Sequence, residues 1–174
     1  MENFKQKLTR IKTLLFDVDG VLTNGQVFLM ESGEFVRNMN SKDGYALQLA
    51  VKKGYRIIVI SGSASDEAVN RLKRLGIADV FMKVVNKKAK LEEYILHHHL
   101  NHAEVLFMGD DIPDIEVMKS AGLACCPADA VEEIKAISAY ISPVNGGFGC
   151  CRDVIEKVLK LKNDWNEDVT ITSS

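Results

Sequence analysis

The chain has 174 residues, of which 47% are hydrophobic and 26% charged, and its formal net charge is -2. Its size and composition are those of one globular domain with a full hydrophobic core. The small negative charge excludes a non-specific nucleic-acid binder, and no apolar run approaches the roughly 18 residues that span a bilayer. The charged first dozen residues also lack the apolar core of a signal peptide. We therefore expect one cytoplasmic domain, residues 1–174, with no nucleic-acid or membrane partner.

Short apolar strands alternate with amphipathic helices along most of the chain. The predicted strands are residues 13–16, 56–61, 80–82, 105–108 and 123–126, and the predicted helices are residues 44–53, 66–75, 87–99 and 114–121. This alternation predicts an α/β fold, a Rossmann-like three-layer α/β/α arrangement with a mostly parallel sheet. In such a sheet the reactive groups lie beyond the carboxyl ends of the strands.

One segment, residues 26–39, interrupts the alternation. Two apolar runs flank residues 31–34, which predicts a β-hairpin of Gln26–Met30 with Phe35–Met39. A lone hairpin is marginally stable in water and needs a surface to pack against. We expect that surface to be another subunit; a hairpin folded back onto its own chain is the alternative. The polar tail, about residues 163–174, is expected to be mobile unless a partner holds it.

Acidic clusters follow two of the predicted strands. Asp17 and Asp19 come after the first strand, and Asp110 and Asp114 after the fourth. Because the carboxyl ends of parallel strands share one edge, we expect these carboxylates in one pocket, where their repulsion requires a cation. Magnesium suits oxygen ligands of this kind. Asp17 is then a candidate nucleophile and Asp19 a candidate proton donor and acceptor.

Two further strand ends carry groups suited to phosphate. Ser61 and Gly62 precede a helix and offer a hydroxyl and free backbone amides, although the same pair also forms ordinary turns and caps. Lys87 begins the next helix, where a cation opposes the helix dipole unless an anion is near. This conflict favours phosphate binding by Lys87 over a solvated surface lysine, but chemistry alone does not separate Lys87 from Lys88.

Together these residues resemble the four motifs of haloacid dehalogenase superfamily phosphatases. The motifs are Asp17-x-Asp19-Gly20-Val21-Leu22-Thr23, Ser61-Gly62, Lys87 and Gly109-Asp110-x-x-x-Asp114. The short span between Asp17 and Asp43 leaves no room for a cap domain. Residues 40–45 and 146–153 are similar to stretches of the capless 3-deoxy-D-manno-octulosonate 8-phosphate (KDO 8-phosphate) phosphatases. Those enzymes are homotetramers in which a neighbouring subunit helps to close the active site.

The resemblance implies a Mg²⁺-dependent phosphomonoester hydrolase that converts KDO 8-phosphate to KDO and phosphate, a step in making lipopolysaccharide precursors. Asp17 would form an aspartyl-phosphate. Asp19 would protonate the leaving sugar oxygen and then activate water. Asp17, Asp19 (through its backbone or water) and Asp110 would surround the metal, with Asp114 in the outer shell.

The same resemblance implies a phosphate site and a sugar site. Ser61, Gly62 and Lys87 would hold the phosphate. The residues implied to face the sugar acid are Asn40, Ser41, Lys42, Asp43, Gly44, Ser63 and Arg71. The family often has arginine where this chain has Ser63 and Gln48, so a nine-carbon keto-acid sugar phosphate is an alternative substrate. A phosphoryl-transferring mutase and a non-catalytic assembly module are further alternatives, and the intact acid pair argues against the module.

Overall fold

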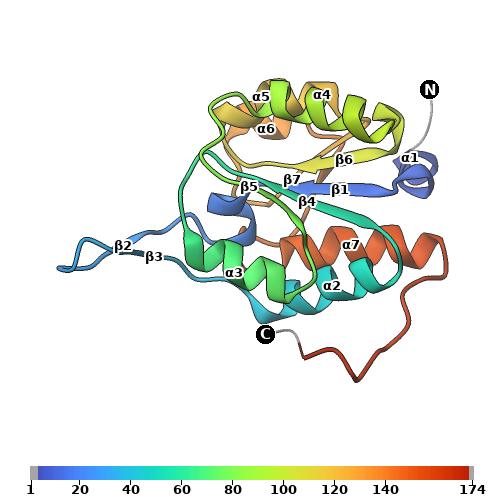
Figure 1. The fold of residues 1–174 in the computed structure, drawn as a ribbon. Helices are drawn as coiled ribbons and strands as arrows, with labels where there is room; N and C mark the ends of the chain where they lie inside the picture. Colours follow the sequence, from blue (N-terminus) through green and yellow to red (C-terminus); the bar gives the residue numbers. More distant parts are fainter. Residues whose placement is uncertain (1–3, 173–174) are drawn as a thin grey trace.

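Within residues 4–172, which the computed structural model describes, six parallel strands form a central sheet (Figure 1). The strands are β1 (Thr13–Phe16), β4 (Arg56–Ile60), β5 (Asp79–Phe81), β6 (Val105–Met108), β7 (Leu123–Cys126) and β8 (Tyr140–Ile141). They pair in the order β5-β4-β1-β6-β7-β8. The strands that precede the two acidic clusters, β1 and β6, are therefore neighbours in the sheet although they lie far apart in the sequence.

Helices cover both faces of this sheet (Figure 1). One face carries α2 (Ser41–Lys52), α3 (Asp66–Arg74) and α7 (Cys150–Leu161), and the other carries α4 (Lys87–His98), α5 (Ile115–Ser120) and α6 (Glu132–Ile137). The short α1 (Phe4–Arg10) packs against α7. Leu14 and Phe16 of β1 belong to the core of the first face and Leu15 to that of the second, because successive side chains of a strand point to opposite faces.

The predicted α/β fold class is confirmed, and residues 4–172 contain no cap domain. Each of the five predicted strands forms, with its ends shifted by at most one residue. Helix α2 begins at Ser41, before the predicted start at residue 44, because the side chain of Asn40 accepts a hydrogen bond from the backbone N–H of Lys42 and caps the helix there. None of the helices within residues 4–172 is both long and apolar enough to cross a membrane.

The predicted hairpin forms, but its strands are shorter than expected. Strands β2 (Phe28–Leu29) and β3 (Phe35–Val36) pair in antiparallel fashion and project from the body of the fold at the edge where the sheet strands end (Figure 1). The alternative in which the hairpin folds back onto its own chain is wrong, because its apolar side chains are exposed. Those side chains are Val27, Phe28, Leu29, Met30, Phe35 and Val36, and the exposed fraction reaches 75% at Leu29.

In its described part, residues 163–172, the tail contacts its own chain. It runs back along α7 and α2 (Figure 1). The Trp165 ring packs edge-on against Tyr45, with centroids 6.2 Å apart. Asp168 forms a 3.1 Å ion pair with Lys52. These contacts belong to the same chain, and composition alone does not reveal them because they join residues distant in sequence.

Candidate active site

The loop that follows β1 holds Asp17 at the edge of the sheet. Asp17 is 8% exposed, and its Oδ1 accepts a 2.7 Å hydrogen bond from the backbone N–H of Val18. The turn Val18–Leu22 is irregular because Gly20 has a φ of 84°, a left-handed conformation that glycine adopts without steric cost. A Cβ atom at Gly20 would overlap the carboxylate of Asp110. The glycine of the Asp-x-Asp-Gly motif thus lets the acid of a second strand approach the first loop.

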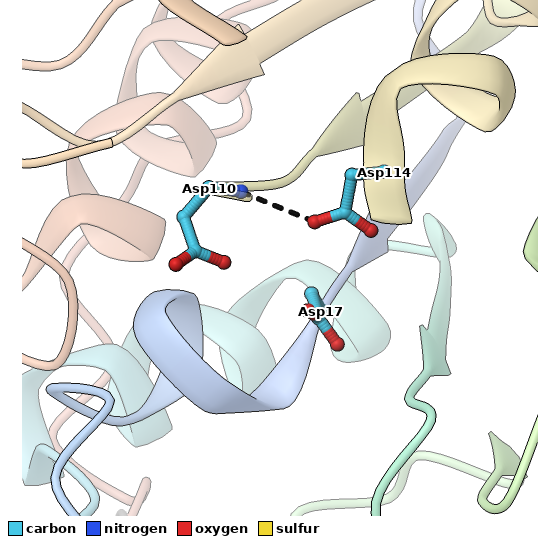
Figure 2. Close-up of side chains that lie close together, drawn as sticks. All are labelled: Asp17, Asp110 and Asp114. Atoms are coloured by element: carbon cyan, nitrogen blue, oxygen red, sulfur yellow. Dashed lines mark hydrogen bonds between the residues drawn. The ribbon is translucent and has the colours of Figure 1, made fainter. Parts of the chain in front are cut away.

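The acids that follow β6 meet Asp17 at this edge. Strands β1 and β6 are paired in register, so that Phe16 and Met108 are partners. Asp114 is 1% exposed, and its Oδ2 accepts a 3.2 Å hydrogen bond from the backbone N–H of Asp110 (Figure 2). One carboxylate oxygen from each of Asp17, Asp110 and Asp114 lies within 4.8 Å of the other two. The structure therefore brings together acids from both sequence clusters.

Lys87 lies between two of these carboxylates. Its Nζ is 2.8 Å from Oδ2 of Asp17 and 2.7 Å from Oδ1 of Asp114, and the residue is only 7% exposed. Burial alone would lower the pKa of Lys87, but the two carboxylates outweigh burial and raise it. Lys88 points elsewhere, with its side chain 49% exposed and 3.9 Å from Glu116. The geometry thus selects Lys87 as the lysine of the site.

The acidic cluster has the electrostatic character of a cation site. Burial raises the pKa of Asp17 to about 6; the carboxylate of Asp114 adds to this effect and Lys87 opposes it. Burial, with the charges of Asp17 and Asp114, raises the pKa of Asp110 to about 8. Among the described residues, none donates a hydrogen bond to the buried Oδ1 of Asp110. A divalent cation would give this oxygen a partner and relieve the repulsion, so these residues fit Mg²⁺.

The phosphate-binding candidates lie at the end of β4. Ser61 is 2% exposed, and its Oγ accepts a 3.2 Å hydrogen bond from the backbone N–H of Ser63. The cap of α3 is Ser65, whose Oγ accepts from the N–H of Ala68, so Ser61 does not serve as a helix cap. A cavity of about 320 Å³ joins these groups to the acids. Its lining includes Asp17, Asp19, Ser61, Gly62, Ser63, Lys87, Asp110 and Asp114.

The segment 40–44, expected to face the sugar acid, makes contacts that hold helix ends. Besides capping α2, Asn40 donates a 3.3 Å hydrogen bond from Nδ2 to the carbonyl of Gly147. Asp43 is 2% exposed and accepts a 2.7 Å hydrogen bond from the N–H of Arg152 in α7, and burial raises its pKa to about 6. Ser41 and Lys42 are exposed, Gly44 is buried, and neither this cavity nor the larger one described next is lined by residues 40–44.

A larger cavity of about 680 Å³ lies between the hairpin and the start of α3. Arg71, expected to face the sugar acid, lines it, as does Arg37, which sequence reasoning missed. Arg37 donates from Nε to Oδ1 of Asp19 at 2.6 Å and from Nη2 to Oδ2 at 3.3 Å. The only sequence signal for this contact is a cation at the end of a hairpin strand, and charge at such a place is ordinary.

Comparison with known proteins gives concordant results. Residues 73–149 match the family model of haloacid dehalogenase-like hydrolases. Over 161 residues the chain is 28% identical to the 3-deoxy-D-manno-octulosonate 8-phosphate phosphatase of Escherichia coli (strain K12). The aligned region covers 92% of this chain and 86% of the relative.

Solved structures agree with the sequence comparison. The same kind of phosphatase from Moraxella catarrhalis, in complex with magnesium ion, phosphate ion and KDO, superposes with a TM-score of 0.89 at 30% identity, covering 92% of each chain. The enzyme from Yersinia pestis superposes with a TM-score of 0.89 at 26% identity, covering 92% of this chain and 86% of that one.

Proposed function

We propose a specific reaction for this chain, which belongs to the haloacid dehalogenase-like hydrolases and is a phosphatase. The reaction is hydrolysis of KDO 8-phosphate to KDO and phosphate, with Mg²⁺ as cofactor. The observation that carries the proposal is the convergence of Asp17, Asp110 and Asp114 within 4.8 Å. Relatives with this activity cover nearly the whole chain. Formation of lipopolysaccharide precursors and a cytoplasmic location are parts of the same proposal.

Asp17 is the nucleophile in this mechanism. Its carboxylate forms a bond to phosphorus as the bond from phosphorus to the sugar oxygen breaks, which leaves an aspartyl-phosphate. The hydrogen bond from Val18 to Oδ1 orients the carboxylate, and Oδ2 faces the ammonium of Lys87. Asp17, Asp110 and Asp19 (through its backbone or water) would hold Mg²⁺, with Asp114 in the outer shell. The bound ion would supply positive charge beside the phosphoryl oxygens.

Asp19 supplies and then removes a proton. It donates a proton to the departing sugar oxygen, and as a carboxylate it then accepts a proton from the water that attacks the aspartyl-phosphate. Lys87 and the hydroxyl of Ser61 line the same cavity and bind the phosphoryl oxygens, over which negative charge spreads in the transition state. The regenerated Asp17 carboxylate and inorganic phosphate complete the turnover.

Two observations support a sugar-acid substrate. The cavity of about 680 Å³ beside the catalytic one is large enough for a sugar, and Arg71 lies in its lining. An arginine matches a carboxylate by paired hydrogen bonds. Ser63 lies in the lining of the catalytic cavity, at a position where the family resemblance implies a common arginine. This difference keeps the nine-carbon keto-acid sugar phosphate as a second candidate substrate.

We also propose that the protein is a homotetramer with active sites at subunit interfaces. The hairpin exposes contiguous apolar side chains at the edge of the molecule that holds the site. Burial of such a patch by other subunits stabilises an assembly.

The test is steady-state release of phosphate from KDO 8-phosphate and from the nine-carbon analogue. We expect a higher kcat/KM for KDO 8-phosphate, and loss of activity on chelation with EDTA. The Asp17→Asn variant should fold normally, because it keeps the shape of the side chain, but should release no phosphate, because the amide is not a nucleophile. A preference for the nine-carbon compound would reject the substrate, and activity in Asp17→Asn would reject the mechanism.

A further inference from the structure

Arg37, at the base of the hairpin, donates two hydrogen bonds to the carboxylate of Asp19, the proposed acid. It lies just beyond β3, at the base of the hairpin. The Arg37 side chain is 12% exposed and that of Asp19 is 32% exposed. Within residues 4–172, both hydrogen bonds to the Asp19 carboxylate come from Arg37. The orientation of the carboxylate is therefore set by the hairpin rather than by its own loop.

Arg37 occupies the wall between the two cavities. Asp19 lines the catalytic cavity of about 320 Å³, and Arg37 lines the neighbouring cavity of about 680 Å³. The Nη1 atom of Arg37 is buried without a hydrogen-bond partner among the described residues. A cation that is so far removed from water, and has one carboxylate for a partner, is a weak source of stability. The ion pair is better explained by the orientation that Arg37 gives to the Asp19 carboxylate.

The two hydrogen bonds in the pair are unequal. The bond from Nε to Oδ1 is 2.6 Å long, whereas the bond from Nη2 to Oδ2 is 3.3 Å. One oxygen of Asp19 is thus held tightly, and the other is held loosely enough to exchange its partner for a substrate oxygen.

We propose that Arg37 is a positioning residue for protonation of the leaving group. The inference rests on the proposed function, in which Asp19 is the acid. Arg37 holds Oδ1, so that the proton on Oδ2 passes to the sugar oxygen as its bond to phosphorus breaks. Asp19 is left as a carboxylate paired with the guanidinium, which stabilises the charge that develops during this transfer.

A leaving-group comparison separates this role from a merely structural one. A sugar alkoxide must be protonated to depart, whereas the p-nitrophenolate of p-nitrophenyl phosphate departs as a stable anion. The value of kcat/KM reports the steps through departure of the leaving group. In Arg37→Ala, kcat/KM for the sugar phosphate should fall by about 10- to 100-fold, and that for p-nitrophenyl phosphate should fall much less.

Two variants control this experiment. Arg37→Lys keeps a cation that can reach Oδ1 and should restore part of the lost selectivity for the sugar phosphate. Asn38→Ala, a change at the neighbouring exposed position of the same segment, should leave both activities unchanged.

The outcomes distinguish the inference from the function on which it rests. Equal losses of kcat/KM on both substrates, or no loss on either, would overturn the role of Arg37 and leave the phosphatase mechanism intact. Equal losses that accompany a changed molar mass in light scattering would assign Arg37 to assembly and overturn the inference as well. Failure of the unchanged protein to hydrolyse either substrate would instead reject the proposed function.

Discussion

At the scale of single residues, the site holds more negative charge from carboxylates than its lysine neutralises. Asp17, Asp110 and Asp114 surround one point, and Lys87 neutralises only part of their charge. The raised pKa values of Asp17 and Asp110 express the remaining repulsion. A divalent cation matches the excess of two negative charges. This match explains in physical terms why two buried acids and the half-buried Asp110 are tolerated so close together.

This balance predicts how magnesium stabilises the fold at different pH. The pKa values of Asp17, about 6, and Asp110, about 8, exceed the ordinary value of 3.8. Without metal, the folded state is therefore favoured while these groups are protonated, and it loses stability as the pH rises from the ordinary value of 3.8 to about 8. Mg²⁺ binds the ionised form, so the rise in Tm caused by a fixed Mg²⁺ concentration should be larger at pH 8 than at pH 6.

Thermal unfolding followed by circular dichroism at both pH values measures this effect. The Asp110→Asn variant is the control; it keeps the shape of the side chain and removes one of the raised pKa values, so its response to Mg²⁺ should be small at both pH values. A rise in Tm that is equal at the two pH values, or larger at pH 6, would contradict the prediction.

At the scale of elements, three loops pack so closely that glycine is required where they touch. The loop before α7 lies on the loop after β1, and a Cβ at Gly146 would overlap the backbone carbonyl of Gly20. The N–H of Gly147 donates a 2.9 Å hydrogen bond to the carbonyl of Val21. The third loop contributes Asp110, whose carboxylate fills the space where a Gly20 side chain would lie. The missing side chains of Gly20 and Gly146 therefore let these loops approach closely enough to place Asp110 beside the loop that holds Asp17.

A pair of glycine variants tests this packing. Gly20 and Gly54 have nearly the same φ, 84° and 83°, but a Cβ at Gly54 meets no atom within 4 Å. Replacement of either by alanine should cost about 1 kcal/mol of unfolding free energy because of the left-handed backbone. Gly20→Ala should also displace Asp110 and weaken Mg²⁺ binding by about 10-fold or more.

Urea unfolding and isothermal titration calorimetry with Mg²⁺ give the two quantities. Gly54→Ala separates backbone strain from displacement of the carboxylate, since only the strain is common to both variants. Equal Mg²⁺ affinities in the two variants would show that Asp110 does not depend on the space that Gly20 leaves.

At the scale of the whole molecule, the hairpin joins the surface to the active site. Leu29 and Phe35 are paired across its two strands and are 75% and 60% exposed. Arg37, at the base of the same hairpin, holds Asp19. The exposed apolar strands, which are the proposed subunit contact, and the residue that orients the acid thus belong to one small element.

If the hairpin is the subunit contact, a charge on its apolar strands should break the assembly. Leu29→Glu should lower the molar mass from that of the proposed tetramer without a change in secondary structure, because a charge is costly to bury at an interface. Val169→Glu, at a site that is 97% exposed on the tail, is the matched control and should leave the mass unchanged. Light scattering after gel filtration measures the mass; an unchanged mass for Leu29→Glu would locate the contact elsewhere.

Local sequence patterns were sufficient to predict the strands and the edge of the sheet that carries the reactive residues. Short apolar runs followed by polar clusters are local patterns, and they predicted five strands to within one residue and placed Asp17 and Asp110 at strand ends. The parallel α/β class followed from the alternation of strands with helices. The motif resemblance added the roles of these residues, and those roles remain proposals.

The three-dimensional packing of the chain shows which residues distant in sequence are in contact. It selected Lys87 over Lys88, assigned Asp43 to the start of α7, laid the tail on its own chain, and paired Arg37 with Asp19. Each of these contacts joins segments far apart in sequence through side-chain geometry, which periodicity does not encode. Local patterns specify elements; the packing of those elements specifies which of several chemically equivalent side chains faces the site.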